Sequence, residues 1–144
     1  MKSNTVVLLI LLLFPFWGMS QNSVIDSVFR KADYFLVRSI PDIAIPELFE
    51  IISLNKKNQL VVDRAHISLA EAYREKTEYK KGILLIYETL KKPEINDWNK
   101  AYAWNRLAAL YQEWRDPNTN YFDSVKKYSQ LCIDLSTKRG FTDH

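Results

Sequence analysis

The stretches HISLAEAY (residues 66–73) and WNRLAALY (residues 104–111) carry one pattern twice, 38 residues apart. Each places four side chains at positions i, i+3, i+4 and i+7, which is the spacing of one face of an amphipathic helix. These are His66, Leu69, Ala70 and Tyr73 in the first stretch, and Trp104, Leu107, Ala108 and Tyr111 in the second. The pattern predicts two related helices, at about residues 60–75 and 97–114.

A polar turn and a second helical pattern follow each of these helices. The second patterns begin at Tyr79 and Tyr121, and Pro93 closes the first of them. Thr77 is the predicted N-cap of the helix from Tyr79, because its hydroxyl can accept a free amide of the first turn. Gly82 lies inside that helix, where Gly costs about 0.5–1 kcal/mol relative to Ala. We therefore expect a backbone or a ring to pack directly against Gly82.

The upstream sequence predicts one more pair of helices. The first runs over residues 24–38, and the second over residues 43–54 after a turn. The predicted packing face of the first helix consists of Val24, Val28, Ala32 and Phe35. Pro46 is tolerated in the second only if it lies in the first helical turn. The chain is thus predicted to be all-α, with three helical hairpins at about residues 24–55, 60–92 and 97–138.

Composition excludes several classes of protein. The 144 residues suit one domain, and 47% hydrophobic with 26% charged residues is the balance of a folded chain. One Cys and two His cannot form an internal disulfide or a closed metal site. The net charge of +3 is small and interspersed, which gives no electrostatic footprint for nucleic acid.

The first twenty residues are typical of a secretory signal peptide. Lys2 precedes an apolar run over residues 6–17, and Gly18 and Ser20 are small residues suited to cleavage after Ser20. The alternative is an uncleaved signal anchor. The sequence predicts export, to a periplasmic or extracellular location, of a mature chain of residues 21–144 without a further membrane span. Cys132 is then expected to be a core residue or, alternatively, to form an intermolecular disulfide.

The hairpins resemble tetratricopeptide repeats, in which a helix–turn–helix of about 34 residues carries Trp, Leu, Gly or Ala, and Tyr on its first helix. The resemblance rests on Trp104, Leu107, Ala108, Tyr111, Ser124 and Tyr128 in the third hairpin, and on Leu69, Ala70, Tyr73, Gly82, Ile86 and Pro93 in the second. The first hairpin fits only at Ala32, Phe35 and Ala44. The resemblance implies an α-solenoid. The alternative is a generic all-α bundle in which the spacing is a coincidence.

The resemblance also implies a groove lined by the first helix of each hairpin, of the kind that holds protein or peptide ligands. By register with the family, the groove residues would be Arg64, Ile67, Glu71, Arg74, Tyr102, Asn105, Ala109 and Gln112. The alternative is that these residues form solvated helix faces. Arg106 and Tyr102 do not reproduce the basic pair by which chaperone-binding members of the family hold a terminal carboxylate.

Catalysis has no support in the sequence, because no nucleophile is paired with a base, and His66 falls at a helix-packing position. We therefore expect an exported protein- or peptide-binding or scaffold module with no catalytic activity and no cofactor. The alternative is the extracytoplasmic sensory region of a membrane two-component histidine kinase, which the exported repeats also resemble. A small helical enzyme is a third hypothesis, without a candidate acid or base.

Phe141–His144 looks like the start of a further repeat, so the last hairpin is expected to continue or to self-associate.

Overall fold

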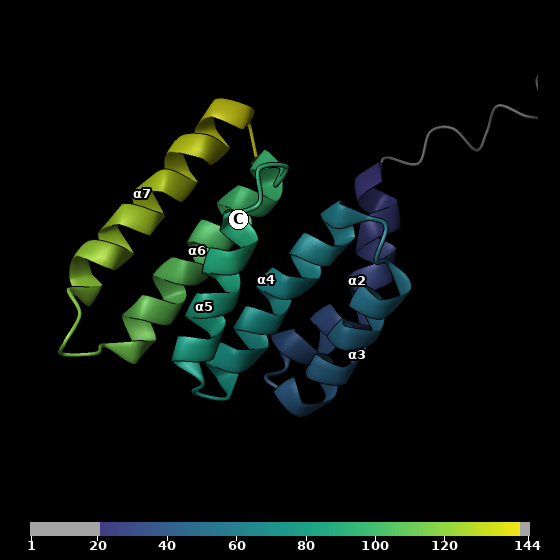
Figure 1. The fold of residues 1–144 in the computed structure, drawn as a ribbon, viewed down its shortest axis with the longest axis horizontal. Helices are drawn as coiled ribbons and strands as arrows, with labels where there is room; N and C mark the ends of the chain where they lie inside the picture. Colours follow the sequence, from purple (N-terminus) through teal and green to yellow (C-terminus); the bar gives the residue numbers. More distant parts are fainter. Residues whose placement is uncertain (1–20, 142–144) are drawn as a thin grey trace, which may run out of the picture.

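A computed structural model describes residues 21–141, and these residues contain helices but no strand. The helices are α2 (Gln21–Val37), α3 (Pro41–Leu54), α4 (Gln59–Glu75), α5 (Tyr79–Leu90), α6 (Asp97–Trp114) and α7 (Tyr121–Arg139). They follow one another across the molecule in chain order (Figure 1). The prediction of an all-α fold is confirmed. The predicted signal peptide, residues 1–20, lies outside the described residues.

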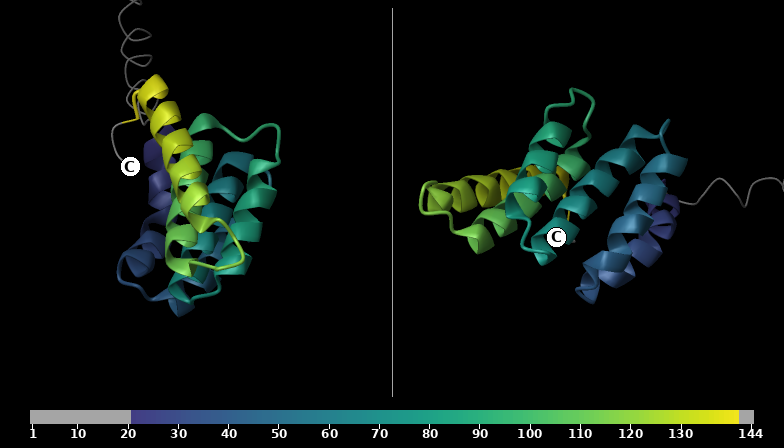
Figure 2. Two further views of the ribbon diagram at one scale, coloured as in Figure 1. Left: turned by 90° about the vertical axis from the view of Figure 1, so that its left-hand side faces the viewer. Right: turned by 60° about the horizontal axis from the view of Figure 1, so that its bottom comes forward.

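The helices pack as three successive hairpins, α2 with α3, α4 with α5, and α6 with α7. Each later hairpin also places its first helix against both helices of the hairpin before it: α4 contacts α2 and α3, and α6 contacts α4 and α5. Figure 2 shows this arrangement from two further directions. Consequently α4 lies in the middle, with neighbours on both sides.

Two hydrophobic clusters hold the helices together, and α4 contributes to both. One joins α2, α3 and α4 around Phe29, Leu48 and Leu69, which are almost completely buried. The other joins α4, α5, α6 and α7 around Ile67, Ile86 and Leu107, which are also buried. A helix that serves two clusters needs apolar side chains on opposite faces, and this explains why most of α4 is buried.

The close helix approach expected at Gly82 is confirmed. A Cβ at this position would lie 3.0 Å from the Ala70 carbonyl oxygen on α4 and 3.0 Å from Leu110 Cδ2 on α6. Gly82 therefore sits where three helices meet. Cys132 on α7 is buried and is not disulfide-bonded within the described residues, as expected for a core residue.

Two expectations about helix ends are wrong. Thr77 does not cap α5: its φ is +59°, and the residue at the cap position is Glu78, which makes no side-chain cap hydrogen bond. Helix α3 starts at Pro41, so Pro46 is its sixth residue and lies in the second turn. There its missing N–H removes a hydrogen bond inside the helix. Asparagine side chains cap α4, α6 and α7 instead, at Asn58, Asn96 and Asn120.

The predicted packing face of α2 is also partly wrong. Ile25, Phe29 and Ala32 are buried, whereas 49% of Val24 is exposed. Two adjacent apolar stripes, one residue apart, fit the helical period of α2 equally well. The stripe that meets α3 and α4 is the one that contains Phe29. Within residues 21–141, no helix is both long enough and apolar enough to cross a membrane.

Candidate functional site

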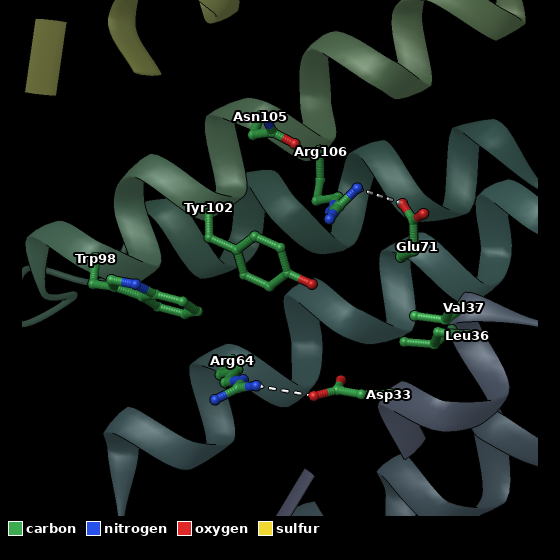
Figure 3. A pocket seen from close by; sticks show the side chains of 9 residues that line it. All are labelled: Asp33, Leu36, Val37, Arg64, Glu71, Trp98, Tyr102, Asn105 and Arg106. Carbon is green, nitrogen blue, oxygen red and sulfur yellow. Dashed lines mark hydrogen bonds and ion pairs between the residues drawn. The ribbon is translucent and has the colours of Figure 1, made fainter. Parts of the chain in front are cut away.

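A pocket of about 440 Å³ lies along the first helices of the three hairpins. Its walls combine charged, aromatic and aliphatic side chains, which Figure 3 shows at close range. The lining residues are Asp33, Leu36 and Val37 from α2, Arg64 and Glu71 from α4, and Trp98, Tyr102, Asn105 and Arg106 from α6. The second helices α3, α5 and α7 contribute no lining residue.

The structure brings together half of the predicted groove residues. Arg64, Glu71, Tyr102 and Asn105 all line the pocket. Three others lie outside it: Arg74 is beside Glu71 at the rim, Ala109 is half-buried on α6, and Gln112 is exposed.

The prediction for Ile67 is wrong. Its side chain is completely buried in the cluster that joins α4 to α6 and α7. The physical reason is the central position of α4. A face that would be open on a terminal helix is covered here by the next hairpin.

Sequence reasoning missed five lining residues: Asp33, Leu36, Val37, Trp98 and Arg106. A usable signal existed for the first of them. The 38-residue period that relates α4 to α6 also relates Asp33 to Glu71, and so extends the groove to α2. Nothing in the sequence indicated that Trp98, the second residue of α6, would reach the same pocket.

Arg64 ties the three lining helices together. Its Nη1 donates to Asp26 Oδ1 at 2.6 Å and its Nη2 to Asp33 Oδ2 at 3.0 Å, both on α2. Its guanidinium carbon lies 4.3 Å from the centre of the Phe29 ring and 5.4 Å from that of Trp98 on α6. Cations at such distances from aromatic faces are attracted to them. The position of Arg64 is therefore fixed from α2, α4 and α6 at once.

Burial raises the pKa of the Asp33 carboxyl, and the nearby Arg64 guanidinium opposes this rise. The carboxylate is thus held in the pocket wall by its arginine partner, against the cost of removing it from water. This arrangement places a fixed negative charge on the α2 side of the pocket.

A second ion-pair group lies at the opposite side. Arg74 donates from Nε to Glu71 Oε2 at 3.1 Å and from Nη2 to Glu71 Oε1 at 2.8 Å. It also pairs with Glu75 and with Glu113 on α6. The hydrogen bonds to Glu71 and the charges of the surrounding carboxylates raise the pKa of Arg74 above its ordinary value. Both oxygens of Glu71 are therefore held by Arg74.

Arg106 is held more loosely than these two arginines. Its Nη1 lies 3.5 Å from Glu71 Oε2, and its guanidinium carbon lies 5.0 Å from the centre of the Tyr102 ring. Its Nε is buried and has no hydrogen-bond partner among the described residues. In the view of Figure 3, the Tyr102 ring projects between the Arg106–Glu71 pair and the Arg64–Asp33 pair.

The pocket combines aromatic rings with charged side chains. Trp98 and Tyr102, with ring centres 5.3 Å apart, offer aromatic surface between two fixed ion pairs. Among residues 21–141, no group of three or more His, Cys, Asp or Glu side chains is placed to hold a metal ion. No protein-family model matches the chain, no curated protein matches it, and no solved structure matches its fold.

Proposed function

We propose that the chain is a helical-repeat module of the tetratricopeptide type, which binds an extended or helical segment of another protein and has no catalytic activity of its own. One observation carries this proposal: the pocket is built from α2, α4 and α6, the first helices of all three hairpins, without a contribution from their second helices. A surface formed by equivalent helices of successive repeats is the one on which stacked helical hairpins hold peptides.

The packing of the helices supports the repeat interpretation. The first helix of a later hairpin contacts both helices of the preceding one, and this relation occurs twice, at α4 and at α6. The 38-residue period places Ala32, Ala70 and Ala108 at equivalent positions of the three first helices, and all three are buried. A chance bundle would not need small residues at the same place in each hairpin.

The pocket walls favour a peptide as the ligand. Arg64 and Arg74 are already engaged by carboxylates, so the walls are fixed before a ligand arrives and less freedom is lost on binding. Aromatic rings beside polar groups suit a chain that carries both apolar side chains and backbone amides. Val37 adds an apolar side chain that is 86% exposed at the pocket.

A peptide-display selection against the purified protein tests the proposal. We expect enriched heptapeptides or dodecapeptides whose binding, measured by fluorescence anisotropy, weakens at least tenfold in Tyr102→Ala, because that ring projects into the pocket. Tyr34→Ala is the matched control: Tyr34 is also a tyrosine on a first helix, is 51% exposed, and does not line the pocket. Selected peptides that bind both variants as they bind the unaltered chain would overturn the groove assignment.

We also propose that this module works outside the cytoplasm, on the strength of the apolar run over residues 6–17 and the small residues before Gln21. Expression of the gene with its native start should yield an envelope or medium fraction in which the chain begins at Gln21, as measured by intact mass. A chain that keeps Met1 and stays in the cytoplasm would contradict export without affecting the groove.

A further inference from the structure

A second cleft, of about 560 Å³, lies between α6 and α7 at the end of the row of hairpins (Figure 1). Asn105 and Ala108 form its α6 wall. The 38-residue period relates these two residues to Ile67 and Ala70 on α4, which are completely buried in the cluster shared with α6 and α7. The positions that the next hairpin covers on α4 therefore line an open cleft on α6.

The wall formed by α7 is open in the same way. On α5, Tyr87 meets the next first helix, because its hydroxyl lies 3.0 Å from that of Tyr111 on α6. The offset of 42 residues between α5 and α7 relates Tyr87 to Ser129, which lines the cleft. Phe122 and Ile133 share the face of Ser129 and are 72% and 57% exposed. The first two hairpins each receive a helix here, whereas within residues 21–141 the backbone of α7 lies close to that of α6 alone.

Helix α2 of a second copy is poorly suited to this cleft. Helices α4 and α6 dock on the preceding hairpin through faces that contain Leu69 and Leu107, both buried. The 38-residue period places Lys31 at the equivalent position of α2, where its side chain is 66% exposed and pairs with Glu47. Burying this ammonium group would be costly. Such a head-to-tail contact would also generate an open chain of copies instead of a closed assembly.

Helix α7 itself is a better partner for the cleft, because its outer face is self-complementary. Large and small residues alternate along this face, in the order Phe122, Ser129, Ile133 and Gly140. They are separated by seven, four and seven residues, which keeps them on one face and reads the same in both directions. When two copies run antiparallel about residue 131, Phe122 lies opposite Gly140 of the second copy and Ser129 lies opposite its Ile133.

The cleft also has room at the required place. Gly140 lines it, and a Cβ at Gly140 would meet no atom within 4 Å. Phe122 is at the other end of α7 and does not line the cleft. Antiparallel packing brings the Phe122 ring of each copy to the Gly140 end of the other. Parallel packing would place the two Phe122 rings against each other and leave the cleft empty.

Electrostatic repulsion does not oppose this arrangement. By helical spacing, Lys126 is the charged residue closest to the outer face of α7. In the antiparallel pair the two Lys126 residues lie about 15 Å apart along the helix axes, at 1.5 Å per residue. This separation exceeds the screening length of about 8 Å at physiological ionic strength.

We propose that the outer face of α7 is a dimer interface, in which α7 of a second copy lies antiparallel in the cleft between α6 and α7. The contact has two-fold symmetry and therefore closes with two copies. It needs no ligand in the groove and stands apart from the proposed function. Since it rests mainly on one pair of 19-residue helices, about 28 Å long, the interface is small and the dimer forms reversibly.

Sedimentation equilibrium of the purified protein tests the dimer. The mean mass should rise from that of one copy to that of two as the concentration increases. Ile133→Asp should raise the dissociation constant at least about tenfold, because it places an unpaired carboxylate in the contact. Leu84→Asp is the matched control: Leu84 is 63% exposed on α5 and does not line the cleft. It should leave the dissociation constant unchanged, and circular dichroism verifies that both variants fold.

A mass that stays at one copy over the whole concentration range would overturn the proposal and leave the cleft to a helix of another protein. Equal weakening by Ile133→Asp and Leu84→Asp would overturn it as well, because self-association would then not depend on α7.

Paired cysteines test the antiparallel register. In a Cys132→Ala background, Ser129→Cys chains are mixed with Ile133→Cys chains and oxidised. Opposed residues of closely packed helices bring their Cα atoms within the limit of about 7 Å for a disulfide. The mixed disulfide should therefore exceed the twofold excess over each homodimer that random pairing gives. A random distribution, or a preference for either homodimer, would overturn the antiparallel pairing.

Amide hydrogen exchange locates the interface without a substitution. Raising the protein concentration should slow exchange in α7 and leave exchange in α2 unchanged, because dimer formation covers α7 alone of these two helices. In the dilute protein, α7 is an exposed end of the molecule. A dimer that forms without slowing exchange in α7 would place the contact elsewhere and overturn the proposal.

Discussion

At the scale of single residues, Gly82 shows how closely the hairpins pack. Because the nearest atom to its missing Cβ is a backbone oxygen, Ala70 O at 3.0 Å, the neighbour cannot rotate away. Gly82→Ala should therefore destabilise the fold by about 1 kcal/mol: overpacking costs about 1–3 kcal/mol, and the better helix propensity of Ala returns up to about 1 kcal/mol. Urea unfolding followed by circular dichroism measures the difference.

The equivalent position in the next hairpin supplies the control. Ser124 aligns with Gly82 and already carries a Cβ, so Ser124→Ala adds no atom to the helix interface. We expect a change within about 0.5 kcal/mol. A Gly82→Ala protein that is more stable than the unaltered chain would show that α4 and α5 can separate without loss.

His66 makes a prediction about pH. Burial lowers its pKa, as does the charge of Lys92, while Asp63 and Glu88 oppose the shift. In the unfolded chain, His66 has the ordinary histidine pKa of about 6.5. As the pH falls, His66 therefore takes up its proton in the unfolded chain at a higher pH than in the folded chain. Stability from this residue should be complete above pH 6.5 and should decrease as the pH falls from there to the folded-state pKa.

Proton NMR titration of the His66 ring measures this shift directly, with His66→Gln to assign the resonance. Lys92→Met should raise the pKa of His66, because it removes a positive charge and also frees the carboxylate of Asp63, which Lys92 Nζ contacts at 2.6 Å. A His66 pKa at or above the ordinary value in the unaltered chain would contradict the prediction.

At the scale of helices, the sequence predicts most of what the structure contains. The predicted helix over residues 97–114 coincides with α6, and that over residues 60–75 differs from α4 by one residue. These succeed because a single apolar stripe and clear polar breaks define them. The errors fall where the local signal is ambiguous: on α2, where two apolar stripes compete, and at Thr77, where backbone geometry decides the cap.

The three helices α5, α6 and α7 are joined by a tyrosine cluster that no sequence pattern indicated. The Tyr87 hydroxyl lies 3.0 Å from that of Tyr111 and 2.7 Å from that of Tyr128. Burial and these two hydrogen bonds raise the pKa of Tyr87. Tyr87→Phe removes both hydrogen bonds and should lower the free energy of unfolding by about 1–2 kcal/mol.

Tyr79→Phe on the same helix is the matched control, because the Tyr79 hydroxyl makes no hydrogen bond with the described residues. Its effect on the free energy of unfolding, measured in the same urea titration, should be close to zero. Equal losses in the two variants would mean that the hydroxyl cluster does not stabilise the contact between these helices.

At the scale of the whole molecule, the candidate site depends on how the hairpins stack, which the sequence could only suggest. The register of the repeat family predicts Arg64 and Tyr102 as groove residues, and both reach the pocket. The register of the repeat family predicts Ile67 as a groove residue too, but its side chain is buried, because α6 covers that part of α4. Which positions of a hairpin remain open is set by the neighbouring hairpin, and no local pattern contains that information.

The stacked arrangement also predicts how stability is distributed along the chain. Helix α4 packs against four other helices, α2, α3, α5 and α6. At one end of the row of hairpins, the backbone of α7 lies close to that of α6 alone. Helix α2 lies at the opposite end of the row. Chains whose repeats contact only their neighbours open from their ends. Amide hydrogen exchange followed by mass spectrometry should therefore be slowest in α4 and α6 and fastest in α2 and α7.

Two substitutions separate the ends from each other. Arg64→Gln removes the contacts of α4 with Asp26 and Asp33, so it should accelerate exchange in α2 and leave α7 unchanged. Tyr87→Phe loosens the contact with Tyr128 on α7, so it should accelerate exchange in α7 and leave α2 unchanged. If either variant changes exchange equally in all helices, the molecule unfolds as one cooperative unit, and the hairpins do not behave as repeats.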